Sequence, residues 1–431
     1  MTRFAQRVQL LGTENAFRVG EDIRRVEATG RTVIRLNLGE PDFNSAENIN
    51  AKAKEAIDSG HSHYTDPAGI PALRKAIAEQ VSATRGFPVD SEQVVVFPGA
   101  KPSIAYTMLT YVNPGDEVIY PSPGFPIYES WLIYVGAKPV PLHLEESKGF
   151  AFTARDLEKL LNARTRVLII NSPSNPTGGV LSQRDLEEIA EVIRSRTDKN
   201  FRVYSDEIYE QILFDGNVHR SITGQPGMRE RTIIVSGHSK TYAMTGWRLG
   251  YAVLPTVEEA TAFKQLNINI FSCTPPFIQE AGVEAMRNPL NPAIIAEMNR
   301  QFQMRRDMVV DALNAIDGIS CARPGGAFYV FPNIAGVCEK LGILSAYESL
   351  PAEKRQKSSP STLFQLFALY RHGVATLDRR SFGVVGSEGR HFLRLSIAAD
   401  MDTLKEGINR LRAASRDSEG FADFFNTMPE R

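Results

Sequence analysis

Between about residues 46 and 290, the spacing of polar and apolar residues alternates between two patterns, one typical of helices and one typical of strands. Amphipathic stretches with helical spacing alternate with short apolar runs of strand length. The predicted helices include 71–84, 102–112 and 183–196, and the predicted strands are 94–97, 117–120, 167–170, 202–205 and 232–235. Strands separated by helices usually form a mostly parallel sheet that is covered on both faces. The pattern therefore predicts an α/β fold.

The pattern changes after about residue 295. A long helical stretch, 296–316, precedes the segment GGAFYVFP, a strand-like segment HFLRLSIA and a last helix at 402–414. We expect these elements to form a smaller α+β domain together with an N-terminal helix over 14–29.

The predicted domains are therefore a large one, 46–295, and a small one made of 1–45 and 296–431. Within the small one, residues 347–362 are rich in Pro, Ser and Lys and are expected to form an exposed connection. The final residues, 415–431, form a polar tail whose phenylalanines are expected to dock on the fold.

Composition narrows the class of protein. The 431 residues are 42% hydrophobic and carry a net charge of −1, which indicates a globular protein without an electrostatic reason to bind nucleic acid. No apolar run reaches the roughly 18 residues of a membrane span. Cys273, Cys321 and Cys338 are too few and too widely spaced for a disulfide framework or a metal motif. We expect a cytoplasmic protein without metal.

The segment NSPSNPTGG, residues 171–179, follows the apolar run that ends at Ile170. Its two prolines and two glycines exclude a continuing helix or strand, so the chain must turn sharply there. In open α/β sheets, ligands bind at this end of the strands. The segment therefore predicts part of a ligand site.

A second segment, SGHSKTYAMTGWRLGY (residues 236–251), follows the predicted strand TIIV and contains Lys240 and Arg248. A lysine that must act as a neutral amine needs a pKa lowered by burial or by a cationic neighbour, as in Schiff-base chemistry. Most lysines taken alone lie in solvent, so this segment alone leaves both interpretations open.

Nine motifs stand in order along the chain: LNLGEPDF, HYTDPAGIPALRKAI, FPGAKPS, PSPGFPIYES, NSPSNPTGG, YSDEIYE, SGHSKTYAMTGWRLGY, RPGGAFYVFP and FLRLSIA. Together they resemble fold-type I pyridoxal-phosphate enzymes, specifically class I aminotransferases of the bacterial aspartate aminotransferase type. The resemblance extends from about residue 5 to about residue 414. It implies pyridoxal 5′-phosphate as cofactor and a homodimer.

The resemblance also implies roles around the cofactor ring. Lys240 would form the Schiff base and move the proton between the substrate Cα and the cofactor, and Asp206 would pair with the pyridinium nitrogen. Asn175 and Tyr209 would hydrogen-bond the phenolic oxygen, and Phe125 would stack on the ring. Without a cofactor, Asp206 would be a turn residue at a strand end and the Asn175 segment a simple loop.

The phosphate requires donors and positive charge, which a helix N-terminus supplies. By resemblance, the donors are Gly99, Ala100 and Lys101 ahead of the helix that begins at Pro102, with Arg248 as a bidentate partner and Ser236 or Ser239 as a further donor. Tyr64 matches a tyrosine that reaches the phosphate of the neighbouring subunit. The alternative for Tyr64 is an aromatic residue of the core.

For the substrate, the resemblance assigns the α-carboxylate to Arg394, with support from Asn175 and from the Gly39 backbone. Lys101 matches a lysine that some relatives use for the distal carboxylate, which favours an acidic substrate such as Asp or Glu. The chain departs from those relatives at Glu14, where they carry small hydroxylated residues. Glu14 would either line the mouth of the site or support the start of the first helix.

Three further features leave alternatives open. Arg379 and Arg380 would bind an anionic substrate or be surface charges, and residues 335–362 resemble an insertion that would cover the entrance. His238 is more consistent with a packed or solvated histidine than with a catalytic one.

The residues and the resemblance together predict an aminotransferase that exchanges an amino group between an L-amino acid and a 2-oxo acid by a ping-pong mechanism. A lyase, decarboxylase or oxidase on the same fold is the alternative. A non-catalytic regulator is disfavoured because Lys240, Asp206 and Arg394 are all present.

Overall fold

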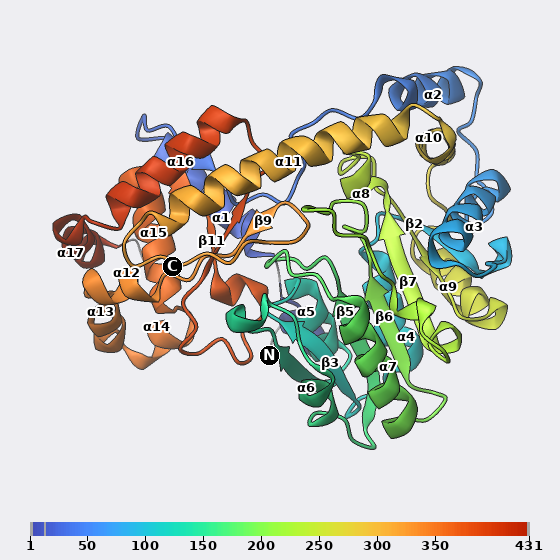
Figure 1. Ribbon diagram of the computed structural model, residues 1–431, viewed down its shortest axis with the longest axis horizontal. Coiled ribbons are helices and arrows are strands. Elements are labelled where there is room, and N and C mark those ends of the chain that lie inside the picture. The colour runs from blue at the N-terminus through green and yellow to red at the C-terminus, as the bar shows by residue number, and fades with distance from the viewer. Residues whose placement is uncertain (1–2, 13, 429–431) are drawn as a thin grey trace.

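The computed structural model describes residues 3–12 and 14–428, and Figure 1 shows how its elements are arranged. A seven-stranded sheet with the order β2-β8-β7-β6-β5-β3-β4 is the largest sheet, and β8 alone of its strands runs against the others. The strands are β2 (Val94–Pro98), β3 (Glu117–Ser122), β4 (Lys138–His143), β5 (Thr165–Asn171), β6 (Arg202–Asp206), β7 (Thr232–Gly237) and β8 (Leu249–Val253). The predicted mostly parallel α/β sheet is confirmed.

The sheet lies between helices, as the predicted alternation requires. These helices are α2 (Glu47–Asp58), α3 (Pro71–Arg85), α4 (Pro102–Tyr111), α5 (Pro126–Tyr134), α6 (Ala154–Glu158), α7 (Gln183–Arg196), α8 (His238–Thr241), α9 (Val257–Ile270) and α10 (Pro276–Arg287). Local signals fix their ends. The Ser182 hydroxyl accepts from the Asp185 N–H at 3.1 Å ahead of α7, and proline opens α3, α4 and α5.

A smaller sheet and a second group of helices lie at the other end of the molecule in Figure 1. The strand order is β11-β12-β9, and β1 pairs separately with β10. The strands are β1 (Ile34–Arg35), β9 (Tyr329–Val330), β10 (Val374–Ala375), β11 (Leu377–Asp378) and β12 (Leu393–Ser396), and the helices are α1 (Asn15–Glu27), α11 (Asn291–Asn314), α12 (Ala335–Lys340), α13 (Ile343–Ser349), α14 (Ala352–Gln356), α15 (Pro360–His372), α16 (Met401–Ala414) and α17 (Ser418–Thr427).

Helix α11 connects the two groups of elements and begins five residues earlier than the predicted 296. Asn291 and Pro292 occupy its first turn, where a proline costs no hydrogen bond. The short 3₁₀ helices of the described chain are η1 (Gln6–Leu10), η2 (Ser91–Gln93), η3 (Glu146–Lys148), η4 (Ile222–Gly224), η5 (Arg229–Arg231) and η6 (Arg379–Phe382).

The prediction of an exposed connection over 347–362 is wrong in part. The segment contains α14 and the start of α15, and Ser361 and Thr362 are buried. Ser359 caps α15 by accepting from the Thr362 N–H at 3.1 Å, so the Ser-Pro pair that suggested a loop instead begins a buried helix.

The docking of the C-terminal tail is confirmed. Phe421 and Phe424 of α17 are buried, and their ring centroids lie 5.5 Å and 5.8 Å from that of Phe367 in α15. All three cysteines are free thiols. Among the described residues, every helix is too short or too polar to cross a lipid bilayer.

The parallel strands deliver polar side chains to one edge of the large sheet. Asn171 ends β5 and Asp206 ends β6, and the two residues are paired in register. The next strand, β7, ends at Gly237 and leads directly into α8, which carries Lys240. The fold therefore brings three segments of the predicted site to one place.

Candidate active site

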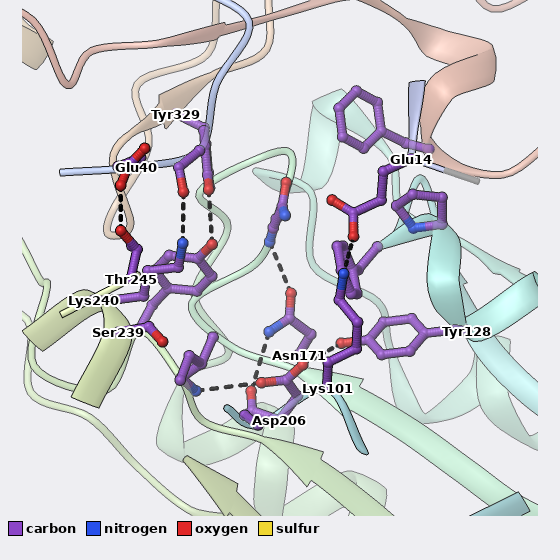
Figure 2. A pocket seen from close by; sticks show the side chains of 18 of the residues that line it. Glu14, Glu40, Lys101, Tyr128, Asn171, Asp206, Ser239, Lys240, Thr245 and Tyr329 are labelled. Atoms are coloured by element: carbon purple, nitrogen blue, oxygen red, sulfur yellow. Dashed lines mark hydrogen bonds and ion pairs between the residues drawn. The ribbon is translucent and has the colours of Figure 1, made fainter. Parts of the chain in front are cut away.

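A cavity of about 490 Å³ lies at this edge of the sheet, and residues of β12 and of the β1–α2 segment also line it (Figure 2). Most of the predicted site residues line it together, although they come from distant parts of the chain. They are Gly39, Ala100, Lys101, Phe125, Asn175, Asp206, Tyr209, Ser239, Lys240, Arg248 and Arg394. Gly99, Ser236 and Tyr64 do not line it.

Lys240 points from α8 into the cavity. Its Nζ donates to the Gly39 carbonyl oxygen at 2.5 Å and lies 6.0 Å from the ring centroid of Tyr209. Burial, and then the positive charge of Arg394, lower the pKa of this amine from 10.5 to about 8. Both causes favour the neutral amine, which is the nucleophilic form.

Asp206 is buried at the floor of the cavity in Figure 2. Its carboxylate accepts from the Tyr128 hydroxyl and, at 3.3 Å, from the Ile208 N–H. Burial raises the pKa of this carboxyl to about 6. Since no lysine or arginine of the described chain forms an ion pair with it, the carboxylate can bind a cationic N–H group of a ligand.

The turn after β5 is held by amide hydrogen bonds. The Asn175 N–H donates to Asn171 Oδ1 at 2.8 Å, and Asn171 Nδ2 donates to the Asp206 carbonyl oxygen at 3.1 Å. The Asn175 side chain faces Arg394, whose Nη1 donates to its Oδ1 at 3.2 Å. The turn is therefore tied to β6 through Asn171, and it presents the amide of Asn175 to Arg394.

Tyr209 lies three residues beyond Asp206 and is also buried. Its hydroxyl lies 2.8 Å from the hydroxyl of Tyr329, and burial followed by this neighbour raises the pKa of Tyr209 well above its usual value. Tyr209 is thus protonated at neutral pH and can donate a hydrogen bond to a ligand oxygen.

The positive end of the cavity is built on the N-terminus of α4, where Ala100 and Lys101 precede Pro102. Arg248 lies against this turn. A Cβ atom on Gly99, which has φ of +85°, would lie 2.1 Å from Arg248 Nη2. Gly99 is therefore required for the approach of Arg248 and contacts no ligand through a side chain.

The structure separates the two serines that the sequence leaves as alternatives. The Ser236 hydroxyl is buried and donates to Glu210 Oε1 at 2.9 Å, away from the cavity. Ser239 lines the cavity beside Lys240 (Figure 2). Ser236 is therefore corrected from a ligand contact to a support of Glu210, and Ser239 stays a candidate.

Tyr64 lies on the connection between α2 and α3 and is 88% exposed in the single chain. The alternative that it is an aromatic residue of the core is wrong. Its side chain does not reach the cavity of its own chain.

Phe125 precedes α5 and presents its ring to the cavity, with the Tyr128 ring packed edge-on at 5.7 Å between centroids. Lys101 Nζ lies 5.6 Å from the Phe125 centroid. The ring offers a flat apolar face close to the floor of the cavity, as stacking on a planar ligand requires.

Arg394 is only 4% exposed although it lies in a short strand, β12. Its Nη2 donates to the Asn37 carbonyl oxygen at 2.5 Å, and its Nε has no hydrogen-bond partner within the described chain. No carboxylate of the described residues forms an ion pair with it. A buried guanidinium with a free donor fits the carboxylate of a ligand.

Glu14 turns into the cavity. It occupies the position ahead of α1, yet its side chain caps no backbone N–H of that helix. Its carboxylate forms an ion pair with Lys101 instead (Figure 2). Glu14 thus stands at the start of α1 without a capping hydrogen bond and also lines the cavity, and Lys101 is not free. Thr13 lies outside the described residues.

The structure contradicts both alternatives that the sequence offers for Arg379. The side chain is buried, and its guanidinium donates to Ser122 Oγ at 2.8 Å and to the Gly383 carbonyl oxygen at 2.9 Å. It is neither a surface charge nor part of the cavity. Arg380 donates to the Gln356 carbonyl oxygen at 2.7 Å and does not line the cavity either.

Two further expectations concern His238 and the segment 335–362. His238 is buried, its Nε2 lies 3.2 Å from the Gly282 carbonyl oxygen, and burial lowers its pKa to about 4. It is a packed neutral histidine. Residues 335–362 form α12, α13, α14 and the start of α15. Of these, α12 and α13 pack against the core around β9 and β12, and none of the residues lines the cavity. The idea that they cover the entrance is wrong.

Sequence reasoning missed three polar residues that shape the cavity. Tyr128 donates to Asp206, Asn171 holds the turn, and Tyr329 partners Tyr209. Asn171 lies at the end of a strand, in the motif NSPSNPTGG. Tyr128 lies in the first turn of a helix, in the motif PSPGFPIYES. Position alone could have marked Asn171, but no local pattern reveals which Asp or Tyr these side chains meet.

Comparison with known proteins agrees with this geometry. Residues 31–411 match the family model described as Aminotransferase class I and II. The chain is 36% identical to an aspartate aminotransferase of Rhizobium meliloti, over 95% of both chains. It is 35% identical to an aromatic-amino-acid aminotransferase of Thermococcus litoralis, over 90% of this chain and 92% of the other.

Solved structures give the same result. The crystal structure of the aspartate aminotransferase from Rhizobium meliloti superposes with a TM-score of 0.86 at 34% identity and covers 96% of this chain and 99% of its own. An alanine aminotransferase from Pyrococcus furiosus gives a TM-score of 0.83 at 28% identity over 96% of this chain.

Proposed function

As a member of the aminotransferase class I and II family, this chain is a pyridoxal-phosphate-dependent aminotransferase, and we propose that it exchanges an amino group between an L-amino acid and a 2-oxo acid by ping-pong turnover. The observation that carries the proposal is the meeting of Lys240, Asp206 and Arg394 in one cavity. Lys240 supplies an amine with a lowered pKa. Asp206 supplies a buried carboxylate that forms no ion pair with a lysine or arginine of the described chain, and Arg394 supplies a buried guanidinium whose Nε has no hydrogen-bond partner there.

The residues fit pyridoxal 5′-phosphate. When bound, this cofactor supplies an aldehyde that condenses with amines and a ring that accepts electrons from the substrate Cα. Lys240 would hold the aldehyde carbon and Asp206 the ring nitrogen, with Phe125 against the ring face. The backbone N–H groups of Ala100 and Lys101 at the start of α4, the guanidinium of Arg248 and the hydroxyl of Ser239 would hold the phosphate.

Asp206 would favour the protonated form of the ring nitrogen, because its buried carboxylate forms no ion pair with a lysine or arginine of the described chain. Tyr209, together with Asn175, would donate to the phenolic oxygen of the cofactor. Both donors are held rigidly, Tyr209 by Tyr329 and Asn175 by Asn171. Rigid donors need no reorganisation when charge develops.

Arg394 would bind the α-carboxylate of the substrate with its planar fork, with support from the Gly39 backbone. A Cβ on Gly39 would lie 2.3 Å from the Tyr329 hydroxyl, so glycine at this position makes room for Tyr329. Lys240, once released from the cofactor, would move the proton of the substrate Cα as a general base. Its lowered pKa keeps a fraction of the amine neutral near pH 7.

Three finer expectations are part of the proposal. Residues 46–295 would form one domain and 1–45 with 296–431 the other, supported by the separation of the seven-stranded sheet from the two smaller sheets. The protein would be a homodimer in which Tyr64 reaches the partner's phosphate site, supported by the exposure of Tyr64. The cytoplasmic location expected from the cysteines stays a prediction.

The preference for an acidic substrate depended on a free Lys101. Curated relatives include enzymes named for aspartate and for aromatic amino acids, so family membership alone leaves the side chain open. In this chain Glu14 pairs with Lys101, and the consequence for the substrate is argued below.

The test is spectroscopic. The loaded enzyme mixed with an amino donor should convert the aldehyde form of the bound cofactor to the amine form and release a 2-oxo acid. Lys240→Ala should abolish this conversion, with Lys264→Ala, an exposed lysine paired with Asp66, as the matched control. A lyase, decarboxylase or oxidase would instead release ammonia, pyruvate or carbon dioxide with the cofactor unchanged.

A further inference from the structure

The ion pair between Glu14 and Lys101 lies inside the cavity, on the side opposite Lys240 in Figure 2. The Glu14 side chain is only 18% exposed, whereas that of Lys101 is 44% exposed. The two residues are 87 positions apart in the sequence, so the segment ahead of α1 is placed to bring this acid to the first turn of α4. The pair is part of the cavity wall.

The remaining charges of the cavity are already assigned. Asp206, Lys240 and Arg248 would serve the cofactor, and Arg394 would serve the α-carboxylate that every amino acid carries. What is left for the substrate side chain is Lys101, Glu14 and Glu40. Lys101 and Glu14 cancel each other's charge as a pair, and Glu40, which lies beside Thr245 on the Lys240 side of the cavity in Figure 2, adds no positive charge.

A second carboxylate on the substrate would find no free cation there. It would have to displace Glu14 from Lys101, which costs the ion pair, and would then lie close to the displaced carboxylate. Glu40 offers no compensation, since it is itself an acid and accepts from the Thr245 hydroxyl. The charge pattern therefore opposes a dicarboxylic substrate.

Apolar side chains also line the cavity, beside polar ones such as Asn15 and Ser381. Leu38, Ile104, Phe125, Leu377 and Phe382 line the cavity together with the pair. An uncharged side chain would bury its apolar surface against these groups without disturbing the pair.

We propose that Glu14 is a specificity-determining residue that neutralises Lys101 and makes the enzyme select amino acids with an uncharged side chain over aspartate and glutamate. The proposal rests on the aminotransferase function and names its substrate class. It also explains why a lysine at position 101, seen in the sequence alone, suggests the wrong substrate.

The first experiment measures the amino-donor half-reaction of the loaded enzyme by stopped flow, with leucine, phenylalanine, aspartate and glutamate. This half-reaction needs no acceptor, so the choice of 2-oxo acid does not affect it. We expect leucine or phenylalanine to exceed aspartate at least about tenfold in the ratio of rate to apparent dissociation constant. If no donor reacts, the proposed function fails; if aspartate reacts best, only this inference fails.

Variants then identify the residue responsible. Glu14→Gln removes the charge at constant shape. It should raise the reactivity with aspartate relative to leucine, measured as rate over apparent dissociation constant, about tenfold or more. Lys101→Met added to Glu14→Gln should reverse this gain, because the gain depends on the released ammonium. Glu158→Gln, which breaks an exposed pair with Arg196, is the matched control and should leave the ratio within about twofold.

A binding experiment gives a readout without turnover. Isothermal titration of the loaded enzyme with succinate and with 4-methylpentanoate compares a dicarboxylate with an uncharged side chain on the same α-carboxylate anchor. We expect 4-methylpentanoate to bind more tightly to the natural enzyme and succinate to gain affinity in Glu14→Gln. Tighter binding of succinate to the natural enzyme, or no gain in the variant, would overturn the inference.

Discussion

Arg394 Nη1 donates to Asn175 Oδ1 at 3.2 Å and so joins two residues that are 219 positions apart in the sequence. The bond links β12 of the smaller sheet to the turn after β5 of the larger one. Because the Asn37 carbonyl accepts from Nη2, the orientation of the guanidinium plane is fixed by two partners, and the remaining N–H groups of the fork can bind a ligand. The site thus depends on the contact between the two sheets.

This geometry predicts the effect of Arg394→Lys. An ammonium keeps the charge but cannot bind Asn175, Asn37 and a carboxylate in one plane, so we expect kcat/KM to fall about a hundredfold, mainly through KM. Steady-state kinetics with a saturating acceptor measures it. Arg184→Lys, at a position 86% exposed on α7, is the control and should change kcat/KM less than twofold. A fall below threefold in Arg394→Lys would exclude Arg394 from substrate binding.

The sequence was sufficient to predict those parts of the site whose chemistry lies within one segment. Asp206 stands at the end of an apolar run that can only be an interior strand, and the turn at 171–179 contains its own prolines and glycines. Such segments have the same local structure wherever they are placed in the fold. For this reason the sheet and the turn at its edge were predicted correctly, whereas the role of Lys240 came from the resemblance and stays a prediction.

Contacts between distant segments could not be predicted. Nothing near Glu14 indicates that it meets Lys101, and the polar string around Arg379 gives no sign that this side chain is buried against Ser122. The partner of a long polar side chain depends on which elements pack together, and hydrophobic periodicity does not record that. The errors at 347–362 and at Ser236 have the same origin.

The lowered pKa of Lys240 gives a prediction for the cofactor-free protein. With a pKa of about 8 the amine is about 10% neutral at pH 7, against about 0.03% for a lysine at 10.5. Reductive methylation of Lys240, followed by peptide mass spectrometry, should therefore show a midpoint near pH 8. Arg394→Gln removes a repelling charge and should move the midpoint upward. A midpoint above 10 in the natural protein would contradict the argument.

A buried ion-pair network supports the segment that carries Asp206 and Tyr209. Arg85, at the end of α3, binds the carboxylates of Glu207 and Glu210, and all three side chains are at most 7% exposed. Arg85→Ala would leave two buried acids with no basic neighbour in the described chain other than His219, which lies against Glu207, and we expect a loss of about 3–5 kcal/mol in the free energy of unfolding. Urea denaturation measures it. Arg184→Ala breaks an exposed pair and should cost less than about 1 kcal/mol.

The same network gives a pH dependence. Burial alone would raise the pKa of Glu207, but Arg85 and His219 hold it well below the usual 4.5. A carboxyl whose pKa is lower in the folded than in the unfolded chain stabilises the fold above pH 4.5 and loses this contribution as the pH falls toward the folded value. The stability difference between the natural protein and Arg85→Ala should therefore shrink on acidification below pH 4.5. A difference that is constant down to pH 3 would show that Glu207 is not the group involved.

Tyr64 tests whether two chains share each site. Its 88% exposure means that Tyr64→Ala removes no packing within its own chain, so the variant should fold normally but bind the cofactor more weakly. Mixing Tyr64→Ala with Lys240→Ala creates hybrid dimers in which one site has both Lys240 and a partner's intact Tyr64. Random exchange of subunits makes about half of the dimers hybrid, each with one complete site, so activity should approach about 25% of the natural enzyme. Activity no higher than the sum of the two separate variants, in a mixture that light scattering shows to be dimeric, would mean that Tyr64 does not complete the site of its neighbour.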